Sequence, residues 1–339
     1  MRVLVTGGAG YIGSVLVRML IDAGYDVICL DRLFFGLESI QELLDNPNFK
    51  LVRDDIRWFN PDVLKGVDIV TDLAALSNDP TGELDPMKTY DINYLGRIRV
   101  ARLSKECRVG RYIFASTCSV YGFQERVVNE NSSLNPLTTY AKAAVLAEKD
   151  ILPLASRDFI VTVLRFATAY GLSHRMRFDL VVNAMTLSLY KEGVIVVEGD
   201  GQQKRPLVHV RDICEAIMKV MEAEPEVVNG EVFNVGSNEQ NYKIIDLAND
   251  IKSAIEKPCR IEFRGQVDRR SYEVDFTKIK TKLNYRTRYT VRDGAREIYR
   301  ALEEGTIKDD LKTITVKWYK HLLEMHKLIK DIEQNGKIL

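Results

Sequence analysis

The stretch that decides the fold is residues 3–13, Val-Leu-Val-Thr-Gly-Gly-Ala-Gly-Tyr-Ile-Gly. An apolar strand runs into glycines at Gly7, Gly10 and Gly13, after which the apolar spacing predicts a helix over residues 14–23. In a dinucleotide-binding turn, one such glycine makes the turn, one lets the backbone approach a pyrophosphate and one lets the helix pack on the strand. Glycines are also common in turns for purely structural reasons, so the glycine motif indicates dinucleotide binding only together with the motifs that follow it.

Composition limits the classes of protein that fit. The chain has 339 residues, of which 46% are hydrophobic, and its 48 basic side chains equal its 48 acidic ones. A large core is therefore expected, while no bulk charge favours nucleic acid or an anionic membrane as a partner. The five cysteines have neither metal nor disulfide spacing, so we expect reduced thiols and no metal. No signal-peptide pattern and no run of about eighteen apolar residues occurs, which predicts a cytoplasmic protein.

The second strand indicates which dinucleotide binds. It is predicted over residues 26–30 and ends at Asp31, about twenty residues after the glycines. A carboxylate there binds both hydroxyls of the adenosine ribose and repels a 2′-phosphate, which favours NAD over NADP. Arg32 is a counter-argument, because a guanidinium could bind such a phosphate.

Alternating strands and helices predict an α/β fold with a doubly wound parallel sheet (Rossmann) and a smaller C-terminal α/β substrate lobe. Strands over residues 49–52, 67–72 and 111–115 lead to polar or small residues at the ligand edge, and a long helix is predicted over residues 86–107. The small side chains after the second of these strands let a dinucleotide lie close to the backbone, or merely pack tightly. The residues at this edge are Asp55, Ile56, Leu73, Ala74, Ala75 and Ser116.

A second group of motifs follows. Ser116-Thr117 precedes Val120-Tyr121-Gly122, and Thr138-Thr139 can cap a helix that bears Tyr140 in its first turn. Together with the glycine turn and Leu164-Arg165, this order resembles the extended short-chain dehydrogenase/reductase family, in particular its nucleotide-sugar epimerases and dehydratases such as UDP-glucose 4-epimerase-like enzymes. The resemblance runs from residue 1 to about residue 305.

The resemblance implies roles for these residues. Tyr140 would exchange a proton with a sugar hydroxyl while hydride moves between the same carbon and the nicotinamide, and Thr117 would bridge the two hydroxyls. The implied cofactor-binding residues are Gly7, Gly10, Tyr11, Ile12, Gly13, Asp31, Arg32, Asp55, Ile56, Leu73, Ala74, Ala75, Ser116 and Tyr140. The implied substrate-binding residues are Thr117, Thr168, Asn183, Arg205 and Arg270, with Arg269 as the alternative to the last.

The sequence departs from the family at two of these positions. The family has a lysine four residues after the tyrosine, and this chain has Ala144. Lys142 cannot replace it, because two residues turn the side chain to the far side of the helix. A tyrosine with a pKa of about 10 is a poor base at neutral pH, so another cation assists, the reaction is slow, or Ala144 is an engineered or natural loss of activity. Thr168 stands where the family has asparagine.

Past residue 172 the strict alternation loosens. We predict an NAD-binding domain over residues 1–172 with later returns of the chain, a substrate-binding lobe over 173–305 and a helical extension over 306–339. Arg175 and Arg177 could reach the substrate diphosphate, although arginines are usually solvated.

Smaller features of the second half are also predicted. His209 is expected to be structural, Asp212 to cap a helix over residues 213–222, and residues 242–255 to form a helix. The helical region over residues 307–332 either packs against the body or forms a partner surface. A homodimer is expected from the family.

Several functions remain open. The first is an NAD-dependent enzyme on a nucleotide-diphosphate sugar, inverting C4 through a 4-keto sugar. A 4,6-dehydratase is a minor option, because Cys118-Ser119 supplies no carboxylate after Thr117. A reductase or dehydrogenase, or an impaired NAD-binding sensor in view of Ala144, is the alternative.

Overall fold

Seven parallel strands form the central sheet of the computed structural model, which describes residues 1–265 and 271–338. Their order across the sheet is β10-β6-β5-β4-β1-β2-β3. The strands are β1 (Arg2–Thr6), β2 (Asp26–Asp31), β3 (Phe49–Arg53), β4 (Ile69–Asp72), β5 (Arg111–Thr117), β6 (Ile160–Phe166) and β10 (Glu231–Val235). The chain winds outward in both directions from β1 and β4, so the predicted doubly wound sheet is confirmed, and the ligand edge lies at the carboxyl ends of these two strands.

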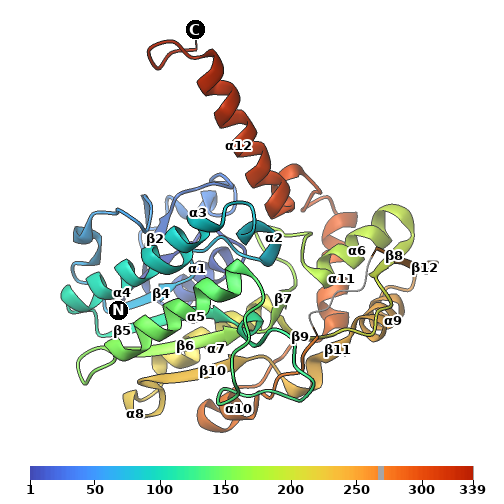
Figure 1. Cartoon of the computed structure of the whole chain (residues 1–339), viewed down its shortest axis with the longest axis horizontal. Coiled ribbons are helices and arrows are strands. Elements are labelled where there is room, and N and C mark those ends of the chain that lie inside the picture. The colour runs from blue at the N-terminus through green and yellow to red at the C-terminus, as the bar shows by residue number, and fades with distance from the viewer. Residues whose placement is uncertain (266–270, 339) are drawn as a thin grey trace.

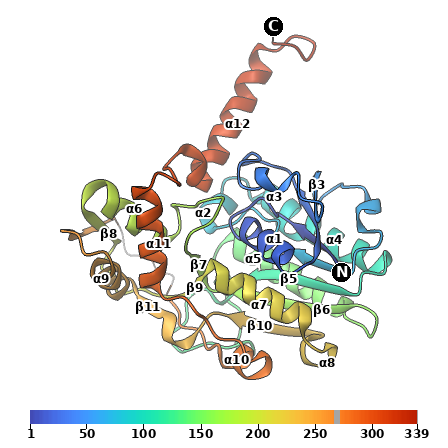
Figure 2. The ribbon, with the colours of Figure 1, turned by 180° about the vertical axis from the view of Figure 1, so that it is seen from behind.

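Helices cover both faces of this sheet. Helices α4 (Arg97–Glu106) and α5 (Thr139–Ile151) lie on one face, and α1 (Gly13–Asp22) and α7 (Val210–Glu222) lie on the other (Figures 1 and 2). Because side chains alternate along a strand, Leu4 points into the core under α4 and α5, while Val3 and Val5 point into the core under α1 and α7. This two-sided burial explains why β1 is continuously apolar.

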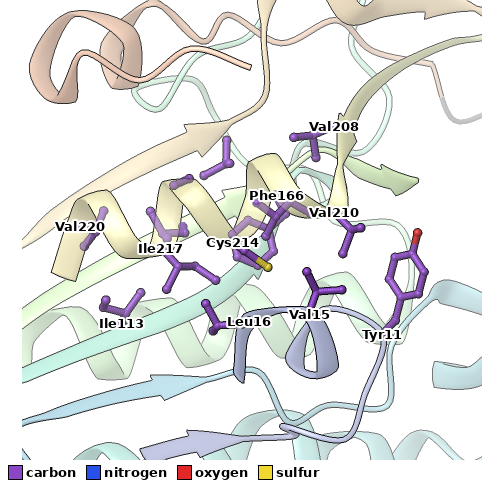
Figure 3. Close-up of a cluster of buried hydrophobic side chains, with 14 of the residues drawn as sticks. Tyr11, Val15, Leu16, Ile113, Phe166, Val208, Val210, Cys214, Ile217 and Val220 are labelled. Atoms are coloured by element: carbon purple, nitrogen blue, oxygen red, sulfur yellow. The ribbon is translucent and has the colours of Figure 1, made fainter. Parts of the chain in front are cut away.

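The core under α1 and α7 joins distant parts of the chain. Val15 and Leu16 of α1 face Cys214 and Ile217 of α7, with Phe166 of β6 beside them (Figure 3). Although α7 lies in the second half of the sequence, it therefore packs as part of the large domain. Strand β10 returns to the same sheet, beside β6.

A smaller lobe lies at one end of the molecule (Figures 1 and 2). Its core contains Val182, Leu189 and Leu247. The lobe is built from α6 (Val181–Glu192), β8 (Val194–Glu198), α9 (Ile244–Ala254), β12 (Arg260–Arg264) and α11 (Val291–Glu303). A three-stranded sheet of β7 (Thr168–Tyr170), β9 (Lys204–His209) and β11 (Asn241–Lys243) leads into it. The remaining helices are α2 (Asp79–Gly82), α3 (Pro86–Tyr90), α8 (Pro225–Val228), α10 (Thr277–Leu283) and α12 (Thr315–Ile332).

Two predicted helix starts are wrong. Helix α7 begins at Val210, and its cap is His209, whose Nδ1 accepts the Arg211 N–H at 3.2 Å. Asp212 instead accepts the N–H groups of Arg288 and Tyr289, at 2.9 and 3.2 Å, and so holds a later loop. Helix α9 begins at Ile244, because the preceding residues pair with β9 as a strand.

Two longer helical predictions are also corrected. The segment over residues 86–107 is interrupted by a π-helical stretch, η3 (Asp91–Gly96). In it the Asn93 side chain bonds both the N–H and the carbonyl of Leu76, at 2.8 and 3.0 Å, which favours this local widening. In the C-terminal region α12 begins at Thr315, after a short turn capped by Asp310.

Helix α12 projects away from the body after its first turns, and the C-terminus lies at its far end (Figures 1 and 2). Its outer part exposes Leu323, Met325, Leu328 and Ile332. The start of α12 packs against the body of the protein, which is one of its two predicted roles. Its outer part does not pack there, and a partner surface on it stays a prediction. Among the described residues, no helix is long and apolar enough to cross a membrane.

The ligand edge is tied together by the fully buried carboxylate of Asp72, the last residue of β4. It accepts the Thr6 hydroxyl of β1 at 2.5 Å and the Tyr112 hydroxyl of β5 at 2.6 Å. Arg97 of α4 forms an ion pair with it at 3.0 Å. One carboxylate therefore fixes three strands and a helix at the point where the sheet order reverses.

We expect Asp72→Asn to lower the free energy of unfolding by about 3–5 kcal/mol, because the Arg97 charge would stay buried without its counter-ion. Urea denaturation followed by circular dichroism measures this. Asp62→Asn is the matched control, because its pair with Lys65 is exposed and should leave the denaturation midpoint nearly unchanged. Equal midpoints for the two variants would contradict the structural role of Asp72.

Candidate active site

One pocket opens at the carboxyl ends of β1, β2, β3, β4 and β5, and every residue predicted to bind the dinucleotide lines it. The structure thus brings together the segments after five strands that are far apart in the sequence. The lining residues from the prediction are Gly7, Gly10, Tyr11, Ile12, Gly13, Asp31, Arg32, Asp55, Ile56, Leu73, Ala74, Ala75, Ser116 and Tyr140. Their binding roles stay predictions.

The glycine turn presents backbone donors to this pocket. A Cβ on Gly13 would lie 2.2 Å from the Gly7 carbonyl oxygen, so only glycine lets α1 start this close to β1. Within the described residues, the N–H groups of Tyr11 and Ile12 donate no hydrogen bond. Free N–H groups at the start of a helix suit the pyrophosphate of a dinucleotide.

The carboxylate of Asp31 is held in place by the backbone. Its oxygens accept the N–H groups of Ala9, at 3.0 Å, and Leu33, at 2.7 Å. Burial raises the pKa of Asp31, and these two hydrogen bonds act in the opposite direction. Each oxygen keeps a second lone pair, which a ribose hydroxyl can use.

Arg32 is turned away from Asp31 and toward Asp55, with 2.6 Å between its Nη1 and Oδ2. Arg57 binds the same carboxylate at 2.9 Å. Burial raises the pKa of Asp55, but its bonds to Arg57 and Arg32 outweigh this and the net shift is downward. The Arg32 charge is thereby balanced within the protein, which supports NAD over a dinucleotide with a 2′-phosphate.

Tyr140 lies in the first turn of α5, after the Thr138 cap that accepts the Ala141 N–H at 3.2 Å. Burial raises the pKa of its hydroxyl, and the nearby carboxylate of Asp79 adds to this. Arg97, a hydrogen bond with Thr117, and Arg177 lower it, but the net shift is upward. The structure therefore brings the predicted pair Thr117 and Tyr140 together.

Among the residues that the structure describes, no lysine takes the place of the missing one beside Tyr140. Ala144 is buried in an apolar cluster, and Lys142 is exposed on the outer side of α5, as predicted. The cations that act on Tyr140 are instead Arg97 and Arg177. Arg97 is already paired with Asp72, and Arg177 is paired with Asp179 at 2.9 Å. This explains why their combined effect does not overcome burial.

Ser116 lines the pocket, although its hydroxyl is already used. It donates to Glu148 of α5, which in turn pairs with Arg165 of β6 at 2.6 Å. Arg165 also donates to the Tyr121 hydroxyl at 2.9 Å. Leu164-Arg165 and Tyr121-Gly122 thus meet in one buried polar network beneath the pocket.

The predicted substrate residues differ in their surroundings. The Arg205 guanidinium lies 5.8 Å from the centre of the Tyr272 ring. Thr168 is half-buried in β7. Arg270 lies outside the described residues.

Asn183 has partners within the protein, and its substrate-binding role stays a prediction. Its side chain is fully buried, donates to the Tyr11 hydroxyl at 3.2 Å and to the Arg177 carbonyl at 2.8 Å, and accepts the Gly171 N–H. The carboxamide is therefore used within the protein, where it positions Tyr11 beside the glycine turn. A direct substrate contact would need these bonds to break.

The residues at the pocket that sequence reasoning missed include Asp79, Arg97 and Tyr319. Asp79 accepts the Thr138 hydroxyl at 2.6 Å beside Tyr140. Nothing in the sequence marks Arg97 as a pocket residue, because an arginine on a helix is usually solvent-exposed. The described residues contain no group of three or more His, Cys, Asp or Glu side chains that could hold a metal.

Comparisons with known proteins agree with this geometry. The model of the NAD dependent epimerase/dehydratase family matches residues 3–236. UDP-glucuronic acid decarboxylase 4 of Arabidopsis thaliana is 32% identical over 87% of this chain and 67% of its own length. UDP-glucose 4-epimerase of Lactobacillus helveticus is 28% identical over 85% and 93%.

Solved structures show the same fold. UDP-glucuronic acid 4-epimerase from Bacillus cereus, in complex with UDP-glucuronic acid and NAD, superposes with a TM-score of 0.80 and 25% identity. The superposition covers 90% of this chain and 99% of that one.

Two glycine substitutions should separate ligand binding from folding. A Cβ on Gly10 meets only the Gly7 carbonyl oxygen, at 3.1 Å, and otherwise points into open space. We expect Gly10→Ala to keep the melting temperature but to weaken NAD binding about tenfold, because the methyl group would crowd the dinucleotide. Gly13→Ala should lower the melting temperature itself. Calorimetric titration and thermal denaturation measure the two effects, and unchanged NAD affinity in Gly10→Ala would contradict the predicted site.

Proposed function

The chain belongs to the NAD dependent epimerase/dehydratase family, and we propose that it is a 4-epimerase that acts on a UDP-sugar through a 4-keto intermediate. It is an enzyme of the nucleotide-sugar type, as are the relatives described above. The observation that supports the proposal most directly is the position of Tyr140 in the wall of the dinucleotide pocket, where β5 ends at Thr117.

Bound NAD supplies the hydride acceptor and returns the hydride to the sugar. Tyr140, as phenolate, would take the proton from the C4 hydroxyl and later give it back. Thr117 would hold that hydroxyl and the tyrosine in line, while its oxygen also accepts the Ser119 N–H at 3.1 Å. Arg205 would bind the diphosphate, because a guanidinium fork matches two phosphate oxygens.

Decarboxylation of a UDP-uronic acid is the second candidate, and the Arabidopsis relatives favour it. Decarboxylation would begin with the same oxidation at C4, so the hydroxyl groups of Tyr140 and Thr117 would have the same roles in it. A 4,6-dehydratase is disfavoured because Cys118 is buried and Ser119 carries no charge. A reductase with net redox turnover and an impaired sensor are the remaining alternatives, and a homodimer stays a prediction.

A substrate panel distinguishes these reactions. The protein with NAD would be incubated with UDP-glucose and UDP-glucuronic acid, then products would be separated and absorbance followed at 340 nm. A C4 epimer without net NADH is the expected result. Release of CO2 indicates the decarboxylase, stoichiometric NADH a dehydrogenase, and no product with either sugar counts against the enzyme.

The pH dependence of the rate follows from the raised pKa of Tyr140. Only the phenolate accepts a proton, and a raised pKa leaves little of it at neutral pH, so the rate should rise as pH increases from 7. Tyr140→Phe should lower kcat about 100-fold or more without preventing NAD binding. A profile that is flat above pH 7 would contradict this role.

Ala144→Lys should shift that profile to lower pH, because a nearby ammonium stabilises the phenolate. We expect kcat at pH 7 to rise about tenfold, which corresponds to a shift of about one pH unit. Val145→Lys, one position further along α5, is the control for added charge alone, since its side chain is only partly buried and turns away from Tyr140. Equal gains in both variants would argue against a local effect.

A further inference from the structure

The start of α12 is fixed to two segments that border the dinucleotide pocket. The Trp318 Nε1–H donates to the Phe34 carbonyl at 2.6 Å, just after β2 and Asp31. The Phe178 N–H donates to the Thr313 carbonyl at 2.8 Å, and Asp179 accepts the Thr315 N–H at 3.2 Å. The first turn of α12 and the turn before it are thus bound both to the segment after β2 and to the segment around Phe178.

Tyr319 is the residue of α12 that lines the pocket itself. Its ring packs edge-to-face on Phe34 and Phe35, with centroids 5.6 and 5.4 Å apart. No hydrogen bond of its hydroxyl is made within residues 1–265 and 271–338. Burial raises the pKa of this hydroxyl and Asp31 adds to this, while Arg175 and Arg177 lower it. The ring contacts with Phe34 and Phe35, which follow Asp31 in the chain, place Tyr319 on the side of the pocket formed after β2.

Arg175 gives a second, independent sign that a ligand is expected here. It lines the pocket, is only 7% exposed, and stacks over the Phe35 ring at 3.6 Å. Its Nη2 donates to the Thr315 hydroxyl of α12 at 3.2 Å, while its Nε is buried without a partner among the described residues. Burial and the neighbouring Arg177 charge lower the pKa of Arg175 to about 10, although the Asp179 carboxylate acts in the opposite direction. A buried guanidinium in this condition suits a phosphate group.

We propose that the first turns of α12 form a wall of the cofactor site, with Tyr319 contacting the adenosine half of the dinucleotide and Arg175 its phosphates. The family resemblance seen in the sequence ends near residue 305, before α12 begins. Asp31, which borders Tyr319, lies at the ribose end, whereas Tyr140 lies at the nicotinamide end. Bound dinucleotide can then leave only when this wall moves, so α12 slows its release.

The proposal rests on the cofactor site and not on the sugar reaction, so its test uses no sugar. Binding of NAD, ADP-ribose and nicotinamide mononucleotide would be measured by calorimetry, and release of NADH by stopped-flow fluorescence, in the full chain. Tyr319→Ala should weaken NAD and ADP-ribose about tenfold and speed NADH release, while leaving nicotinamide mononucleotide unchanged. Leu328→Ala, at an exposed position of the same helix, should change none of these.

Tyr319→Phe keeps the contacts with Phe34 and Phe35 and removes only the hydroxyl. If the alanine variant does not fold, this variant tests whether Tyr319 contacts the adenosine half of the dinucleotide. We expect it to weaken ADP-ribose several-fold, as for the loss of one hydrogen bond. Unchanged ADP-ribose binding in every folded Tyr319 variant would overturn the proposal. An equal loss for nicotinamide mononucleotide would overturn it too, since the effect would then not be confined to the adenosine side.

Discussion

The buried carboxylate of Asp72 is the constraint on which the site depends. It lies where the order of the sheet reverses and holds the ends of β1, β4 and β5 through Thr6, Tyr112 and the Arg97 ion pair. The Thr6 hydroxyl also accepts the N–H groups of Leu73 and Ala74, at 3.1 Å each. The network thereby sets the two loops between which a dinucleotide lies, and the same Arg97 lowers the pKa of Tyr140. The ion pair of Asp72 and Arg97 therefore both stabilises the fold and acts on the predicted catalytic tyrosine.

Because Arg97 is paired in this network, it lowers the pKa of Tyr140 less than an unpaired cation would. Arg97 cannot act on Tyr140 as a free cation would, because its charge is balanced by Asp72, and Arg177 is balanced in the same way by Asp179. A lysine at position 144 would lie one helical turn from Glu148, whose carboxylate is already paired with Arg165. The chain thus keeps the geometry of the tyrosine–threonine pair while lacking the charge that makes the tyrosine a strong base, which predicts slow chemistry rather than absent chemistry.

The sequence predicted what local patterns determine. The glycine turn, the strand ends and the first turn of α5 follow from spacing and capping, and the α/β fold and the family were predicted correctly. Contacts between distant segments were not predictable, since nothing local marks Asn93 as a partner of Leu76 or Asp212 as a partner of Arg288. Tyr319 was not predictable as a pocket residue either, because its place in the pocket depends on how α12 docks.

Docking of α12 also bears on the choice of reaction. An epimerase or a decarboxylase that passes through a 4-keto sugar restores NAD within each cycle, so slow release of the cofactor does not limit turnover. A reductase or dehydrogenase must exchange its cofactor every cycle, and slow release would then limit kcat. A wall built from Tyr319, Phe34 and Phe35 across the adenosine side therefore suits the first kind of enzyme. The C-terminal extension, although distant from Tyr140 in sequence, thus favours an internally balanced redox cycle.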